Sequence, residues 1–172
     1  MTAQPEFVIE TPRLRLRRFR ETDLDAYARI NSDAEVTRFL GSGRPISRED
    51  SWRQIAMFLG HEQIRGYSVL AIEDRTTGEF LGRSGPWFPE GWPMLEVGWV
   101  VDPLRRGEGI ATEAGRASID WCFAQLGASE VCSIIRAENI PSARVAARLG
   151  AKIERVLPEF FGAPADLWVH RP

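Results

Sequence analysis

Residues 105–112 combine two arginines and two glycines in the order Arg-Arg-Gly-Glu-Gly-Ile-Ala-Thr, directly before a segment of helical periodicity. Glycine adopts positive φ freely and lets a ligand approach the backbone closely. The first amides of a helix have no partners within the helix and carry partial positive charge, so this turn suits a phosphate or pyrophosphate group. Arg105 and Arg106 add cationic donors.

Two known phosphate-binding motifs and one plain structural turn are the alternatives at this position. A nucleoside triphosphatase loop requires Gly-Lys-Ser/Thr, which the segment lacks. A dinucleotide fingerprint requires three glycines in another spacing within an early βαβ unit. A plain tight turn capped by Thr112 stays open, because the glycines alone fit it equally well.

Glu96 is a carboxylate in the middle of an otherwise apolar strand, predicted over residues 94–101. Burial in such a strand raises the pKa of a carboxyl group toward neutrality, which suits a general base. Because strand residues alternate between faces, Glu96 shares its face with Gly98 and Val100, and the glycine leaves room for a substrate. The alternative is a carboxylate on the solvent-exposed face of the strand.

Hydrophobic periodicity predicts the elements that must position these residues. The predicted strands cover residues 13–19, 67–73, 79–83, 94–101, 131–135, 152–156 and 165–169. Two short helices are predicted after Thr22 and Ser47, and two more over residues 111–126 and 141–149. This order gives an α+β fold with about seven strands, mostly antiparallel with one parallel crossover, and about four helices.

The composition limits the classes of function. The 172 residues are 44% hydrophobic and 27% charged, which suits one globular domain over residues 1–172. A net charge of −2 argues against nucleic acid as the main partner, and no apolar run is long enough to span a membrane. Residues 1–10 lack a signal-peptide pattern, and two cysteines are too few for a disulfide scaffold or a zinc site. We therefore expect a cytoplasmic protein without a metal.

The segment from Glu96 through the glycine turn resembles the acetyl-CoA signature of the GNAT superfamily of N-acetyltransferases. The superfamily pattern of Arg or Gln, two residues, Gly, one residue, and Gly or Ala falls on Arg106, Gly109 and Ala111. The continuation Ala-Thr-Glu-Ala resembles the branch of RimJ/RimL-like ribosomal-protein N-terminal acetyltransferases. Residues 139–150 match the Asn-x-x-Ser and Leu-Gly segment of that branch, and the resemblance spans about residues 9–170.

The resemblance implies a three-layer α/β/α fold whose mixed sheet splays open after its fourth strand, with acetyl-CoA as the acyl-donor cosubstrate. The pantetheine arm would bond to the strand backbone in that opening, and the pyrophosphate would lie on the amides of residues 107–112. Asn139 would lie near the pantetheine arm, although an N-cap before Pro141 is the alternative. The implied cofactor-binding residues are Trp99, Val100, Val101, Arg106, Gly107, Glu108, Gly109, Ile110, Ala111, Thr112 and Asn139.

The resemblance also implies Glu96 as the general base, acting directly or through water on a primary amine. Many members carry a tyrosine at a position that aligns with about Ala146 here, so Ser142 is the implied partner of the departing thiolate. A helix cap is the alternative role for Ser142. Cys122 and Cys132 are interpreted as core residues rather than nucleophiles.

The acceptor amine belongs to a protein N-terminus or to a small molecule. Aromatic side chains and one carboxylate are candidates to hold it: Trp87, Phe88, Glu90 and Trp92 before Glu96, and Phe160 and Phe161 between the last two strands. Packing of a proline-rich loop is the alternative role for these residues. A second copy of the chain, forming a homodimer, is a further candidate partner.

Two rival functions use the same cleft. An acyl-CoA-binding sensor would keep the cofactor site without turnover, and a nucleotide-binding protein would use only the glycine turn. Glu96 favours an enzyme, because a degenerate module has no reason to keep a carboxylate in the middle of a strand.

Overall fold

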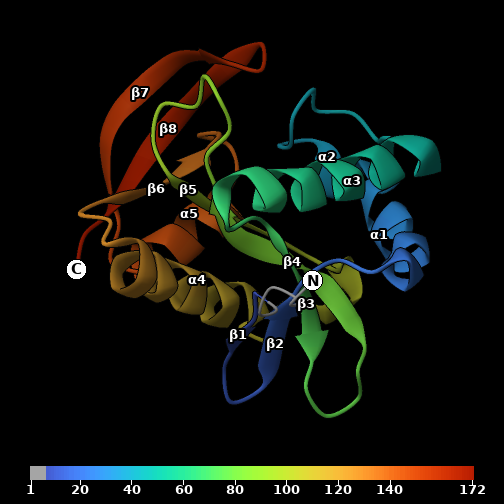
Figure 1. Ribbon diagram of the computed structural model, residues 1–172. Helices are drawn as coiled ribbons and strands as arrows, with labels where there is room; N and C mark the ends of the chain where they lie inside the picture. The colour runs from blue at the N-terminus through green and yellow to red at the C-terminus, as the bar shows by residue number, and fades with distance from the viewer. Residues whose placement is uncertain (1–6) are drawn as a thin grey trace.

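The computed structural model describes residues 7–172, so residues 1–6, which the signal-peptide argument includes, lie outside the described range. Within this range the chain forms an eight-stranded mixed sheet between two layers of helices (Figure 1). The strands are β1 (Ile9–Glu10), β2 (Leu14–Arg17), β3 (Leu70–Asp74), β4 (Phe80–Trp87), β5 (Glu96–Val101), β6 (Val131–Ile135), β7 (Lys152–Phe160) and β8 (Ala163–His170). The helices are α1 (Leu24–Asn31), α2 (Ala34–Thr37), α3 (Arg48–Arg65), α4 (Ile110–Leu126) and α5 (Ile140–Arg148).

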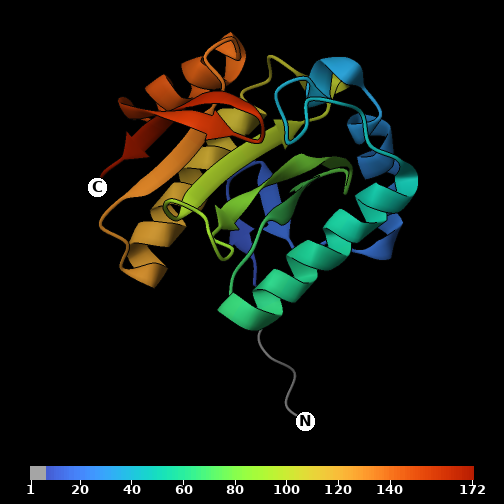
Figure 2. The same ribbon diagram turned by 90° about the horizontal axis from the view of Figure 1, so that it is seen from above.

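The sheet has the order β1-β2-β3-β4-β5-β6-β8-β7, and every described pair is antiparallel except β5 with β6. Figure 2 shows α3 crossing one face of the sheet, with α4 and α5 on the other face. The predicted three-layer α+β fold, with one parallel crossover in a mainly antiparallel sheet, is therefore confirmed.

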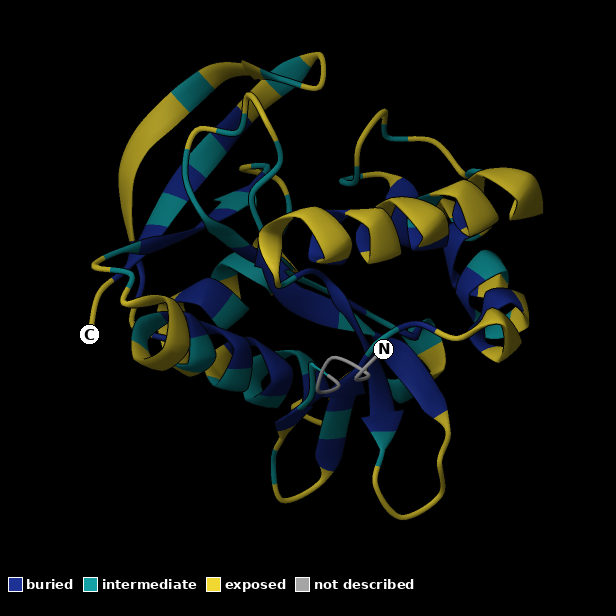
Figure 3. Ribbon diagram, in the orientation of Figure 1, coloured by how far each residue is buried: buried dark blue, intermediate teal, exposed yellow. Residues whose placement is uncertain are grey.

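The structure corrects the predicted elements in several places. Strand β1 has only two residues and α2 only four, which is too short for periodicity to reveal. Helix α3 is not short: it runs for 18 residues until Gly66 turns left-handed, and most of its outer face is exposed (Figure 3). Strand β4 continues to Trp87, so this tryptophan lies in the sheet rather than in the following loop.

Strand β5 contributes to both layers of the core. Val100 packs with Phe19, Tyr27 and Phe58 on the side of α1 and α3, whereas Val97 packs with Ile119 on the side of α4. The predicted alternation, with Glu96, Gly98 and Val100 on one face, is confirmed.

The sheet opens between β5 and β6. Strand β5 is the predicted fourth strand, because the two-residue β1 was not predicted, so the predicted position of the opening is confirmed. The two strands pair only at Glu96 and Cys132, where the Cys132 amide donates to the Leu95 carbonyl at 2.8 Å. One step further along, the Ser133 hydroxyl donates to the Val97 carbonyl at 2.7 Å. Beyond that contact the two strands diverge. The next backbone groups of β5 on the side of β6 therefore have no strand partner, whereas the other edge of β5 stays paired with β4.

Candidate active site

A groove of about 690 Å³ follows the opening between β5 and β6. It is bounded by the end of β5, the glycine turn, the first turns of α4 and α5, and the segment around α2. The predicted site residues that line it are Trp99, Val100, Val101, Arg106, Gly107, Gly109, Ile110, Ala111, Thr112, Asn139 and Ser142. Glu108 and Glu96 do not line this groove.

The glycine turn presents an uncapped helix N-terminus to the groove. Gly107 and Gly109 adopt φ of 83° and 78°, and Gly109 is the N-cap of α4. No side chain within residues 7–172 caps this helix, so Thr112 does not cap the turn, and the binding of a phosphate there stays a prediction. The first amides of α4 are therefore free for an anion.

The first strands of the chain hold this turn in place. The Arg13 guanidinium donates to the Glu108 carbonyl at 3.0 Å and to the Glu113 carboxylate at 2.6 Å. The Thr11 hydroxyl also donates to Glu113, at 2.6 Å. Glu113 lies in the first turn of α4, so these contacts fix the direction of its N-terminal amides.

The Glu108 side chain pairs with Arg105 and is not part of the groove lining. Arg105 donates to both of its carboxylate oxygens, at 2.8 and 2.9 Å, and this pairing holds the pKa of Glu108 below its usual value. The position therefore contributes backbone to the turn, and its negative charge is neutralised before an anionic ligand approaches.

Strand β5 offers its backbone to the groove at alternate residues. Leu95 and Val97 direct their carbonyls at β6, so the same side of Trp99 and Val101 faces the opening. Val100 pairs with Arg83 on β4, which directs its backbone away from the opening. By this alternation the Val100 N–H and C=O do not face the opening, and a contact between Val100, which also lines the groove, and a ligand stays a prediction.

The walls of the groove are rich in arginine, although the chain as a whole has a net charge of −2. The arginines that line it are Arg38, Arg105, Arg106, Arg144 and Arg148. The Arg38 guanidinium lies 4.4 Å from the centre of the Phe39 ring, which also lines the groove. Sequence reasoning missed the segment around α2, because it lies far from the glycine turn in the chain.

Glu96 lies where β5 and β6 separate. The Trp92 indole donates to its Oε2 at 2.6 Å, and the Ile134 amide on β6 also donates to the carboxylate. Burial raises the pKa of Glu96 above its usual value, whereas these two hydrogen bonds and the positive charge of Arg83 oppose the rise. Its Oε1 leans over Gly98, 3.7 Å from where a Cβ atom of that residue would lie. A carboxylate with a raised pKa and one oxygen free of Trp92 is suited to act as a general base.

Asn139 and Ser142 lie together at the start of α5. The Asn139 side-chain oxygen accepts from the Ser142 amide at 3.3 Å, so Asn139 is the N-cap of the helix. The alternative that Ser142 itself is the cap is therefore wrong. Both residues line the groove, which leaves the Ser142 hydroxyl available to a ligand.

Aromatic residues form a wall beside Glu96. The Trp92 ring lies 6.3 Å from Trp87 and 5.3 Å from Phe160, measured between centroids, and Trp87 in turn lies 5.4 Å from Phe58 on α3. Phe161, at the turn between β7 and β8, packs against Trp92 at 5.8 Å. Phe88 was also considered from the sequence. Its backbone amide donates to His61 at 3.3 Å, and its ring lies under the Arg65 guanidinium.

Other reactive side chains belong to the core. Cys122 and Cys132 are buried and unpaired, as expected, and burial raises the pKa of the Cys122 thiol to about 12. Residues 7–172 contain no cluster of three or more His, Cys, Asp or Glu side chains suited to a metal ion. No helix in the described part of the chain is long and apolar enough to cross a membrane.

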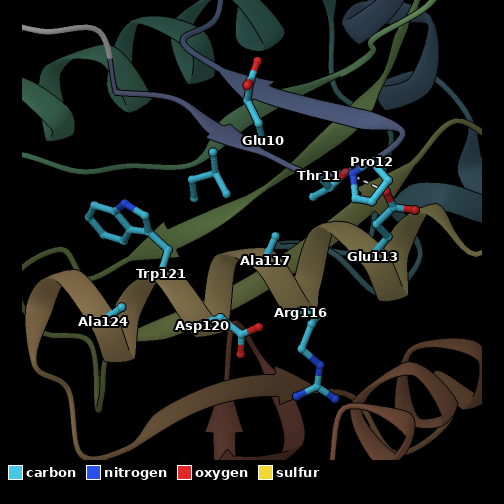
Figure 4. Close-up of a pocket in the computed structure, with 10 residues that line it drawn as sticks. Glu10, Thr11, Pro12, Glu113, Arg116, Ala117, Asp120, Trp121 and Ala124 are labelled. Atoms are coloured by element: carbon cyan, nitrogen blue, oxygen red, sulfur yellow. Dashed lines mark hydrogen bonds between the residues drawn. The ribbon is translucent and has the colours of Figure 1, made fainter.

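A second hollow, of about 500 Å³, lies between β1 and the outer side of α4 (Figure 4). Its Glu113 is already bonded to Thr11, and its Trp121 packs against Phe7 at 4.6 Å. Arg116 and Asp120 point away from β1 in this view. The groove beside Glu96 is therefore the stronger candidate for a site.

Comparisons with known proteins show that the chain is similar to acetyltransferases. A family model described as "Acetyltransferase (GNAT) domain" matches residues 13–152. The uncharacterized N-acetyltransferase YoaA of Bacillus subtilis (strain 168) is 28% identical over 167 residues, which cover 95% of this chain and 94% of YoaA. The crystal structure of an acetyltransferase from Agrobacterium tumefaciens str. C58 gives a TM-score of 0.85 at 27% identity, covering 100% of this chain and 97% of that one.

A more distant structure shares the fold. The RimL ribosomal L7/L12 alpha-N-protein acetyltransferase in complex with coenzyme A gives a TM-score of 0.79 at 17% identity, covering 96% of this chain and 98% of RimL.

Proposed function

Because the chain belongs to the GNAT acetyltransferase family, we propose that it transfers the acetyl group of acetyl-CoA to a primary amine, with residues 1–172 as one catalytic domain. The observation that carries this proposal is the Glu96 carboxylate beside a groove with an uncapped helix N-terminus and an unpaired strand edge. The name of RimL makes a protein N-terminus one candidate acceptor, and a small-molecule amine is the other.

The groove has the chemistry that acetyl-CoA requires. The free amides of residues 110–112 and the nearby Arg106 suit a pyrophosphate, and the remaining arginines suit the other phosphate of the cofactor. The backbone N–H and C=O groups of Trp99 and Val101 face the opening between β5 and β6, where they can pair with the amide groups of an extended pantetheine arm. Bound there, acetyl-CoA supplies a thioester whose carbonyl carbon an amine can attack.

Glu96 removes the proton that blocks this attack. A lysine amine has an ordinary pKa near about 10.4 and an α-amine near about 8, so either is largely protonated at neutral pH. Oε1 is the accepting atom, because Trp92 occupies Oε2. The amine nitrogen then bonds to the acetyl carbon and the carbon–sulfur bond breaks. The second proton of the nitrogen passes to the departing sulfur, which gives the CoA thiol, and the Ser142 hydroxyl donates a hydrogen bond to that sulfur as it leaves.

The test is Glu96→Gln, which keeps the shape of the side chain and removes its basicity. We expect kcat to fall about 10²- to 10⁴-fold, with the Kd for acetyl-CoA nearly unchanged. Glu138→Gln is the matched control, because Glu138 is an exposed carboxylate in the lining of the same groove. A wild-type protein that binds acetyl-CoA but acetylates no amine would be a sensor, and normal turnover by Glu96→Gln would exclude Glu96 as the base.

A further inference from the structure

Arg83 is a cation on β4 that the rest of the protein leaves unsatisfied. Its Nε is buried without a hydrogen-bond partner, and no carboxylate among residues 7–172 forms an ion pair with it. Its guanidinium lies 5.5 Å from the centre of the Phe58 ring. A buried polar group without a partner costs free energy, which a charged ligand would recover.

Arg17, on β2, shows how the same fold treats a structural arginine. Its guanidinium donates to Asp23 at 2.8 Å and to Glu73 at 2.5 Å, and all three side chains are nearly inaccessible. At Arg17 the fold therefore supplies two carboxylates to a buried guanidinium. At Arg83 it supplies an aromatic ring and, within residues 7–172, no carboxylate at ion-pair distance, although the charge of Arg83 still acts on Glu96.

Glycine occupies the paired positions of β4 and β5 that lie between Arg83 and Glu96. Arg83 pairs with Val100, Gly85 with Gly98, and Trp87 with Glu96, so the two glycines lie between the cation and the carboxylate on one face. Within the described residues, a Cβ atom on Gly98 would meet only Glu96 Oε1 inside 4 Å. A Cβ atom on Gly85 would instead meet the backbone of Ser68 at 2.7 Å, so the open position is Gly98, over which a small molecule can lie with one end toward each charged group.

The size of this space indicates a small ligand. At a rise of about 3.3 Å per residue, the four steps from Glu96 to Val100 span about 13 Å of strand. The long side chains of Arg83 and Glu96 occupy part of that length. The aromatic rings of Phe58, Trp87 and Trp92 stand beside it.

We propose, building on the proposed function, that the acceptor is a small primary amine that also carries an anionic group, which Arg83 binds while the amine faces Glu96. A carboxylate and a phosphate both present oxygens that match the planar fork of a guanidinium. Polyamines and basic peptides are disfavoured, because their second cation would lie against Arg83.

The test uses matched acceptors that differ only in the anion. Glycine, β-alanine, 4-aminobutyrate and 6-aminohexanoate are each compared with their own amides, and O-phosphoethanolamine is compared with ethanolamine, by release of free CoA thiol. The amino-acid series varies the distance between amine and anion, and the phosphate pair separates the two kinds of anion. We expect kcat/KM to favour the anionic member at least about tenfold for the best spacing.

Arg83→Met should remove most of this preference, and Arg83→Lys should restore part of it. Arg65→Met is the control, since Arg65 also lies over an aromatic ring, 5.7 Å from the centre of Phe88, but is at the C-terminal end of α3 and pairs with the carboxylate of Glu90. Melting temperatures check that each variant folds.

Three outcomes would overturn the inference: equal or better use of the neutral members, an unchanged preference in Arg83→Met, or acetylation of neutral and basic peptide N-termini alone. In each of these the protein still acetylates an amine, so the proposed function stands. Failure to acetylate any amine would instead refute the proposed function.

Discussion

The hydrogen bond from Trp92 to Glu96 makes the pH dependence of the enzyme testable. Trp92→Phe removes the indole N–H that donates to Oε2 at 2.6 Å and keeps an aromatic ring beside Trp87 and Phe160. This donor stabilises the ionised carboxylate and so opposes the effect of burial on the pKa. Without it, the pKa of Glu96 rises further.

The size of the shift follows from the strength of the bond. A hydrogen bond to a charged group contributes about 1.5–3 kcal/mol, and one pKa unit corresponds to about 1.36 kcal/mol. Trp92 and Glu96 both retain some solvent-accessible surface, and the Ile134 amide remains as a donor, so we take the lower end of this range. The expected rise is therefore about one unit.

The assay is the pH dependence of kcat/KM for one amine acceptor in both proteins. A base must be deprotonated to act, so the acidic limb of the profile should move to higher pH by about one unit in Trp92→Phe, while the plateau at high pH changes little. Taking the ratio of the two proteins at each pH cancels the ionisation of the amine, which both share.

Trp87→Phe is the matched control, because it removes an indole from the same aromatic wall without removing a donor to Glu96. An acidic limb that stays in place in Trp92→Phe, or moves to lower pH, would refute the assignment of Glu96 as the titrating base. An equal shift of the acidic limb in Trp87→Phe would mean that altered packing of the aromatic wall, and not the lost hydrogen bond, moves the pKa of Glu96.

Three further predictions concern the cofactor turn, the leaving group and stability. Gly109→Val places a β-branched residue at φ 78°, so calorimetry should show acetyl-CoA binding weakened at least about 100-fold, and normal binding would exclude this turn as the pyrophosphate site. Ser142→Ala should lower the single-turnover rate about 10-fold with an unchanged melting temperature, since Asn139 is the cap; an intact rate would remove Ser142 from the mechanism. Burial lowers the pKa of His170 to about 4, so the unfolded state binds a proton first as pH falls below about 6.5, and urea unfolding should show about 2 kcal/mol less stability at about pH 5 than at pH 7. His170→Gln should remove most of that difference, and a pH-dependence equal to wild type would contradict the assignment to His170.

Local patterns in the sequence were sufficient to predict the part of the groove formed by β5, the glycine turn and the start of α4. The positions of Gly107 and Gly109 before a helix, and the alternation along residues 94–101, depend only on near neighbours in the chain. The same is true of the crossover through α4, which follows from the order of elements. These features are confirmed by the structure.

The surroundings of Glu96 could not be predicted in the same way. Trp92 lies only four residues before Glu96, but its hydrogen bond depends on how a proline-containing loop folds back on the strand. Arg83 looks like any polar residue of an alternating strand until the absence of a carboxylate beside it, within the described residues, becomes visible. The segment around α2 approaches the groove through tertiary packing alone.

The divergence of β5 from β6 also places a strand edge in the interior of the molecule. Most sheets carry their unpaired edges at the rim, where short strands or charged residues discourage pairing with another chain. Here the exposed edge lies in the middle of an eight-stranded sheet, just beyond Val97. An extended pantetheine arm would act as the missing strand, so the cofactor would complete the sheet as well as carry the acyl group. The concentration of free and acylated CoA would then determine the fraction of molecules in which this edge is unpaired and could pair with another chain.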